Sequence, residues 1–73
     1  MSNLKNVRME AGISQTQLAK ASGVSFRMIQ YYEQGVKNID SAKLETLAAL
    51  ARALNCGLGD ILDHPEILRD IHV

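Results

Sequence analysis

The stretch that decides the fold is ISQTQLAKASGVSFRMIQYYEQG, residues 13–35. Its pattern of polar cap residues and spaced apolar residues predicts two short helices, over 15–22 and 26–34, joined by a tight turn. Isolated helices shorter than about 12–15 residues are marginal in water. The two helices therefore need a scaffold, which the rest of the chain must supply.

Start and stop signals for these helices repeat within the stretch. Ser14 and, three residues on, Gln17 form a capping box, in which hydroxyl and amide each satisfy a backbone N–H of the first turn. Ser25 is expected to cap the second helix. Gly23 suits the sharp turn between the helices, and Gly35 suits the end of the second, because glycine adopts positive φ at little cost.

The flanking sequence predicts three further helices. One covers 2–11 with Ser2 as its cap, one is expected to begin at Asp40 as its cap and end near Asn55, and a short one covers about 58–62. The predicted fold class is thus all-α, a compact five-helix bundle. The apolar residues of the fourth helix that we expect to face the core are Leu44, Leu47, Ala48, Leu50, Ala51 and Leu54.

Arg8 is the exception on the first helix, because it shares the apolar face. An unpaired buried ion is very unfavourable, so a core-facing arginine needs a partner. Glu33 is the expected partner, since it follows Ile29 by four residues on the inward side of its helix. The alternative is that Arg8 lays its aliphatic stem on the core and extends its charge to solvent.

Composition describes one small domain of 73 residues with a formal net charge of zero. The charge is unevenly placed: residues 1–37 carry five cations and two carboxylates, a net +3, and residues 38–73 carry three cations and six carboxylates, a net −3. Such halves suggest a basic face and an acidic end, although chance placement of surface charge gives the same pattern.

Catalytic and metal sites are not expected. Cys56 is the only cysteine, so there is no CxxC pair, and it reads as a small core residue rather than a reactive thiol. His64 and His72 are apart from any serine or cysteine constellation, and His64 reads as a surface residue. With no cofactor motif, signal peptide or membrane-spanning apolar run, we expect a non-enzymatic cytoplasmic protein.

Two motifs together resemble a known family. QTQLAxxxGVSxxxIxxYExG, residues 15–35, is similar to the helix-turn-helix of the phage repressor and Cro-like (XRE) family, and LETLxxLARAL, residues 44–54, is similar to that family's fourth helix. The resemblance covers about residues 4–62. It implies a repressor-like five-helix bundle, residues 1–63, that binds double-stranded operator DNA as a homodimer, followed by a tail or short helix over 64–73.

The resemblance also implies a DNA-contacting set, with Arg8–Glu33 as a structural ion pair. Arg27 can donate two hydrogen bonds to guanine, Gln30 can pair with adenine, and Phe26 can press on a thymine methyl. Gln15 matches the position that contacts a phosphate, and Lys37 is placed to contact the backbone. The residues implied at DNA are Gln15, Ser25, Phe26, Arg27, Gln30, Tyr31 and Lys37.

Each of these residues has a structural alternative. Arg27 and Gln30 are also ordinary solvated helix residues, Phe26 can fold back beside Ile29, and Tyr31 can pack at the helix edge. The rival function is a protein-interaction module on the same fold, such as an antitoxin-like or phage regulatory partner protein. The zero net charge of the chain favours that rival, whereas the positive charge of residues 1–37 favours DNA.

Overall fold

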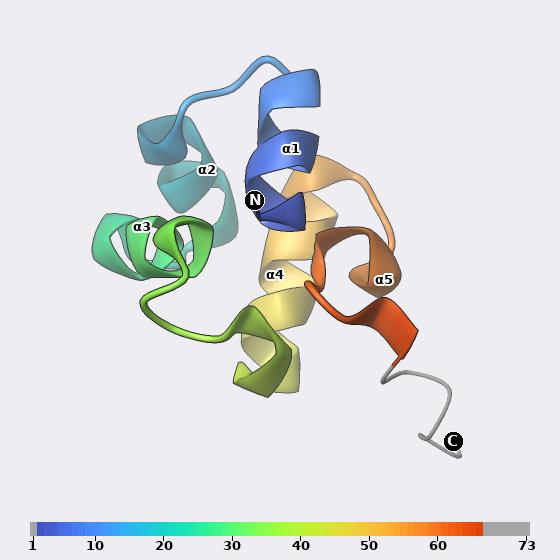
Figure 1. The fold of residues 1–73 in the computed structure, drawn as a ribbon. Coiled ribbons are helices and arrows are strands. Elements are labelled where there is room, and N and C mark those ends of the chain that lie inside the picture. The colour runs from blue at the N-terminus through green and yellow to red at the C-terminus, as the bar shows by residue number, and fades with distance from the viewer. Residues whose placement is uncertain (1, 67–73) are drawn as a thin grey trace.

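The computed structural model describes residues 2–66, and in this range the fold is helical without strands (Figure 1). The expected five-helix bundle is confirmed, with one additional 3₁₀ turn between the third and fourth α-helices. No helix of the described residues is long and apolar enough to cross a membrane. The elements are α1 (Asn3–Glu10), α2 (Gln15–Ser22), α3 (Phe26–Gln34), η1 (Ile39–Ser41), α4 (Leu44–Leu54) and α5 (Leu58–Ile61).

The helix-turn-helix forms from the local signals in its sequence. The Ser14 hydroxyl accepts the backbone N–H of Gln17 at 3.0 Å, and the side-chain Oε1 of Gln17 accepts the backbone N–H of Ser14 at 2.7 Å, which completes the capping box. Ser25 caps α3. Gly23 ends α2 at φ +77° and Gly35 ends α3 at φ +78°, a left-handed conformation that side chains with a Cβ rarely adopt.

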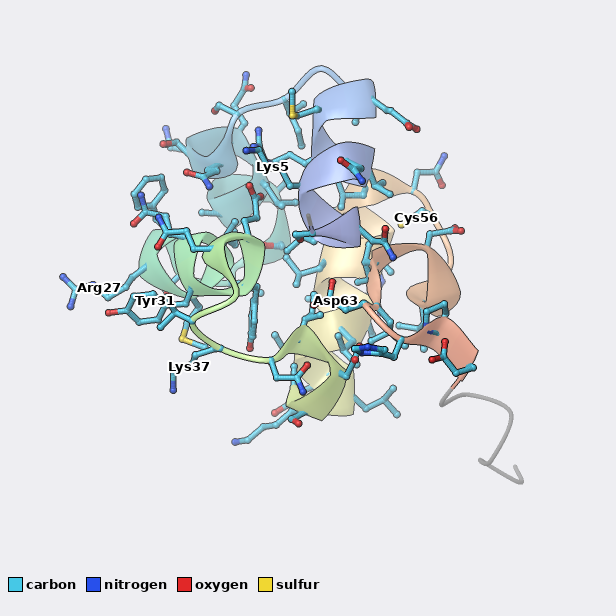
Figure 2. All side chains as sticks on the ribbon, in the orientation of Figure 1. Lys5, Arg27, Tyr31, Lys37, Cys56 and Asp63 are labelled. Carbon is cyan, nitrogen blue, oxygen red and sulfur yellow. The ribbon has the colours of Figure 1, made fainter. Side chains whose placement is uncertain are left out.

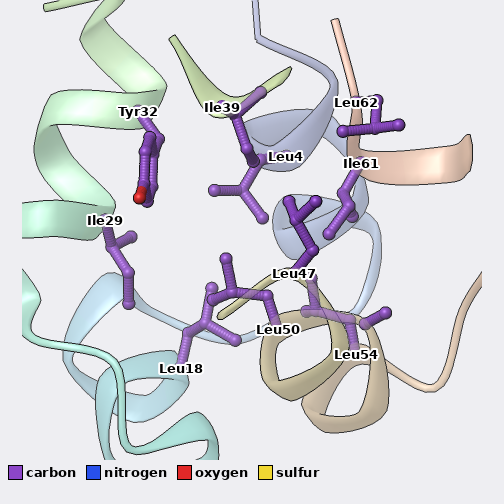
Figure 3. Packing of buried hydrophobic residues seen from close by; sticks show 11 residues of the cluster. Leu4, Leu18, Ile29, Tyr32, Ile39, Leu47, Leu50, Leu54, Ile61 and Leu62 are labelled. Carbon is purple, nitrogen blue, oxygen red and sulfur yellow. The ribbon is translucent and has the colours of Figure 1, made fainter. Parts of the chain in front are cut away.

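The core lies where α4 meets the other helices (Figure 3). α4 packs against α2 and α5, while α1 packs against α5 and α3. This arrangement fixes α2 and α3 on a common support, although each is too short to persist alone. The buried hydrophobic side chains are Leu4, Leu18, Ile29, Tyr32, Ile39, Leu47, Leu50, Ala51, Leu54, Ile61 and Leu62.

The start of α4 differs from the prediction. Asp40 does not cap this helix but lies inside η1, which is capped by Asn38 through a 3.0 Å bond from the Asp40 N–H. α4 begins four residues later at Leu44, and the Lys43 side chain before it makes no capping bond. Leu44 is 68% exposed, so its predicted place in the core is wrong. Leu44 is the first residue of α4, and it stays exposed although Leu47 and Ala51 on the same face of the helix are buried.

The Asp40 carboxylate instead binds the chain beyond α5, in a contact that we call the C-terminal latch. Oδ1 accepts the backbone N–H of Asp63 at 2.9 Å and that of His64 at 3.2 Å, and Oδ2 lies 2.7 Å from Nδ1 of His64. His64 is exposed, as expected, but its pairing was not foreseen. The tail or short helix expected over 64–73 lies outside the described residues from residue 67 onward.

Candidate nucleic-acid interface

α3 presents one buried face and one polar, solvent-facing side. Ile29 is fully buried and Tyr32 is 6% exposed, which anchors the helix in the core. Arg27 is exposed, and Gln30 and Tyr31 are partly exposed between the anchors. Because residues three and four apart share a helix face, the buried spacing of 29 and 32 leaves 27, 30 and 31 facing outward.

The first turn of α3 adds an apolar contact surface. The Phe26 side chain does not fold into the core, since the residue is 43% exposed. Ser25 is also exposed, and its hydroxyl oxygen accepts the Met28 N–H at 3.1 Å, which leaves the hydroxyl hydrogen free to donate. Met28 packs against the core cluster from this side of the helix.

Cations and an aromatic side chain gather on this side of the molecule. Figure 2 shows Arg27 and Tyr31 projecting from α3, with Lys37 beside them on the segment after that helix. Cys56 lies on the opposite side of the view, and Asp63 lies near its middle. Within residues 2–66 neither Arg27 nor Lys37 takes part in an ion pair. Both charges are therefore available to an anionic partner.

An open groove of about 550 Å³ runs beside α3, between this helix and the start of α4. Lys37 and Lys43 both line it, and the N-terminus of α4 opens there without a side-chain cap. Uncapped N–H groups at a helix start favour anions. Lys43 was not expected at this groove, because α4 was predicted to begin at Asp40. The complete lining is Met28, Tyr32, Lys37, Asn38, Ser41, Ala42, Lys43 and Thr46.

Behind the interface lies the expected ion pair. Arg8 Nε donates to Glu33 Oε2 at 2.7 Å, and Nη2 donates to Oε1 at 3.0 Å. The third guanidinium nitrogen, Nη1, donates to the backbone carbonyl of Ile13 at 2.8 Å. The Arg8 side chain is 12% exposed and that of Glu33 is 3% exposed, so the solvent-facing alternative for Arg8 is wrong. Hydrogen bonding to Glu33 raises the pKa of Arg8.

Gln15 joins this pair, which the sequence did not indicate. Its Nε2 donates to Glu33 Oε1 at 3.1 Å. We call the four residues Arg8, Ile13, Gln15 and Glu33 the three-helix hub, because they connect α1, the α1–α2 connection, α2 and α3. Gln15 is only partly exposed, and it lies at the first position of α2.

Comparison with known protein families identifies the fold. A helix-turn-helix family model matches residues 4–61, which is 58 of the 73 residues and includes both helices of the motif. Searches of the curated proteins and of the solved structures found no match. The matched range also includes α4, its connection to α3 and α5. The chain therefore belongs to the XRE, Cro/C1-type helix-turn-helix family of DNA-binding regulators.

Proposed function

We propose that this protein is a sequence-specific transcriptional regulator that inserts α3 into the major groove of double-stranded DNA. The observation that carries the proposal is the division of α3, whose buried residues Ile29 and Tyr32 hold it rigidly while Arg27, Gln30 and Tyr31 face outward. The N-terminal part of a recognition helix meets base edges in this fold. Arg27 lies in the first turn of α3, and Gln30 and Tyr31 follow it by about one turn.

Their chemistry is suited to reading bases. The Arg27 guanidinium can donate two hydrogen bonds to O6 and N7 of guanine, and the Gln30 amide can pair with N6 and N7 of adenine. The exposed ring of Phe26 offers an apolar surface to a thymine methyl. Ser25 and Tyr31 carry hydroxyl groups that can reach a base or a phosphate.

Two anchors for the DNA backbone flank α3. One is the start of α2, where the Gln15 amide and the helix N-terminus favour a phosphate. The other is the groove with Lys37, Lys43 and the uncapped start of α4. Phosphate contacts set the register of the protein on DNA, and base contacts then determine which sequence is preferred.

A homodimer supports this function better than a monomer. Arg27 is the only cation of α3, and few phosphate contacts give modest affinity through counterion release. Two copies on two half-sites, one helical turn apart, double the contacts and give a pseudo-palindromic operator. We assign DNA binding to a domain over residues 1–63 and place residues 64–73 outside that domain.

The decisive experiment combines a salt series on mixed-sequence duplex DNA with selection of a preferred site. We expect affinity that falls steeply with salt and a selected sequence with two half-sites. Arg27→Ala should then weaken binding to the selected site by about 1–3 kcal/mol without changing the melting temperature. Arg52→Ala is the matched control, because it removes an exposed cation from α4, outside α3 and the groove.

Two outcomes would reject the assignment. If Arg27→Ala left the selected site bound as before, α3 would not be the reading helix. If the protein failed to bind any duplex at low salt, the fold would serve as a protein-interaction module. The exposed aromatic ring of Phe26 favours that second function, since aromatic side chains are enriched among the residues that dominate binding between proteins.

A further inference from the structure

The buried carboxylate of Glu33 receives more donors than an ion pair requires. It accepts two N–H groups from Arg8 on α1 and one from Gln15 on α2. We propose that Glu33 is a positioning residue for DNA binding, which holds the Gln15 amide in the one orientation that can donate to a backbone phosphate. This inference rests on the proposed function, because it concerns how that interface is prepared.

The two ends of a glutamine amide differ in hydrogen bonding. A glutamine side chain carries a donor group, NH₂, and an acceptor, the carbonyl oxygen, and only the donor end can bind a phosphate oxygen. An unrestrained Gln15 would present either end. An ionised Glu33 only accepts, so it selects the Nε2 end. One Nε2 hydrogen is then used at 3.1 Å to Oε1, and the second remains for the ligand.

Burial explains why this orientation is held firmly. The Glu33 side chain is 3% exposed, so water does not compete for its oxygens, whereas Gln15 is partly exposed and reaches the surface. A hydrogen bond to a charged acceptor is roughly twice as strong as one between neutral groups. The buried carboxylate of Glu33 therefore fixes the orientation of the Gln15 amide at the start of α2.

Arg8 removes the electrostatic objection to this arrangement. A carboxylate behind the contact would by itself repel a phosphate. Two hydrogen bonds from the guanidinium of Arg8 to both oxygens of Glu33 balance that charge. Arg8 is also held by its hydrogen bond to the Ile13 carbonyl at 2.8 Å. This bond connects the guanidinium to the segment that leads into α2.

A purely structural role makes a different prediction. If the Gln15–Glu33 bond only joined α2 to α3, its loss would affect stability, and Gln15→Ala would change DNA affinity equally with or without Glu33. If Glu33 positions the amide, the effect of Gln15→Ala on affinity depends on Glu33. A double-mutant cycle measures this dependence directly.

The cycle compares the wild type, Gln15→Ala, the pair replacement Arg8→Met with Glu33→Leu, and the triple variant. Replacing both partners of a buried pair by apolar residues is often tolerated, whereas removing one is not. Affinity for duplex DNA is measured by fluorescence anisotropy across a salt series, well below each melting temperature. Should the pair replacement not fold, Glu33→Asp provides a second background, since it keeps the charge opposite Arg8 but shortens its reach.

We expect Gln15→Ala to weaken binding about tenfold in the wild-type background and less than about twofold where Glu33 is replaced or shortened. The slope of affinity against salt should stay unchanged in Gln15→Ala, because Gln15 carries no charge. Equal losses in both backgrounds, or no loss in the wild type, would overturn the positioning role while leaving DNA binding established. A wild-type protein that binds no DNA would overturn both proposals.

Discussion

Between residues 2 and 66, two ion pairs of equal length lie in very different surroundings. Arg8 and Glu33 approach to 2.7 Å, and so do His64 and Asp40. In the three-helix hub both side chains are buried, at 12% and 3% exposure, whereas in the C-terminal latch the His64 ring is 71% exposed and Asp40 is 7% exposed. Because solvent screens an exposed charge, distance alone does not determine how much a pair contributes.

The two carboxylates also differ in the donors that they receive. Both accept three hydrogen bonds, but two of those on Glu33 come from one permanently charged side chain, Arg8. Two of those on Asp40 come from the backbone N–H groups of Asp63 and His64, and only the third comes from a titratable ring. Loss of charge in the latch therefore leaves most of its bonds in place, whereas the hub depends on both partners remaining intact.

The largest effect should come from breaking the hub. Glu33→Ala leaves the guanidinium of Arg8 buried without its counter-charge, so we expect the free energy of unfolding to fall by about 3–5 kcal/mol. Urea denaturation followed by circular dichroism measures this change. Glu10→Ala is the control, because it removes an exposed carboxylate from α1 and should stay within about 0.5 kcal/mol. A loss below about 1 kcal/mol for Glu33→Ala would mean that the Arg8–Glu33 pair contributes no more to stability than an exposed ion pair does.

Breaking the latch should have a smaller effect. Asp40→Ala removes the acceptor of two backbone N–H groups and of the His64 ring, which resembles the loss of a helix cap and should destabilise by about 1–2 kcal/mol. Asp40→Asn retains a carbonyl oxygen that can accept one of these donors, and should lose less. The same denaturation measurement applies. If Asn were as harmful as Ala, the negative charge rather than the backbone bonds would hold the latch.

The smallest effect should be the dependence of the latch on pH. The hydrogen bond to Asp40 and its negative charge raise the pKa of His64 above 6.5, with minor help from the charges of Glu66 and Asp63. A raised folded-state pKa means that this stabilisation is complete below about pH 6.5 and is lost as the pH rises through the folded value. Because the ring is largely exposed, the change should be small.

Melting temperatures at about pH 5.5 and about pH 8.5 test this dependence. The melting temperature of the wild type should exceed that of His64→Gln by more at the lower pH than at the higher pH. His72→Gln should behave as the wild type. A difference that follows His72 instead would exclude the latch as its source.

At acid pH the Asp40 carboxylate titrates. Its burial alone would raise its pKa, but hydrogen bonds from the ring and backbone of His64 and from the backbone of Asp63 outweigh the effect of burial and lower the pKa. Its contribution is therefore present above pH 3.8 and is lost as the pH falls through the lowered value.

The local sequence determined the helices of the motif. α2 and α3 begin and end at the predicted residues, because Ser14, Ser25, Gly23 and Gly35 act through hydrogen bonds and backbone angles within a few residues of themselves. Periodicity also placed Ile29 on the inward side of α3, where it is fully buried. The Arg8–Glu33 pair was predictable because a charge on an apolar face requires a partner.

Only the tertiary structure decided the contacts between segments distant in sequence. Asp40 reads as a helix cap in its own neighbourhood, yet its carboxylate is taken by Asp63 and His64, 23 and 24 residues away. Gln15 was expected from its sequence position only to contact a phosphate, yet it donates to Glu33, 18 residues on. A polar side chain bonds to whichever donor or acceptor packing brings to it, and no local pattern records which partner that is.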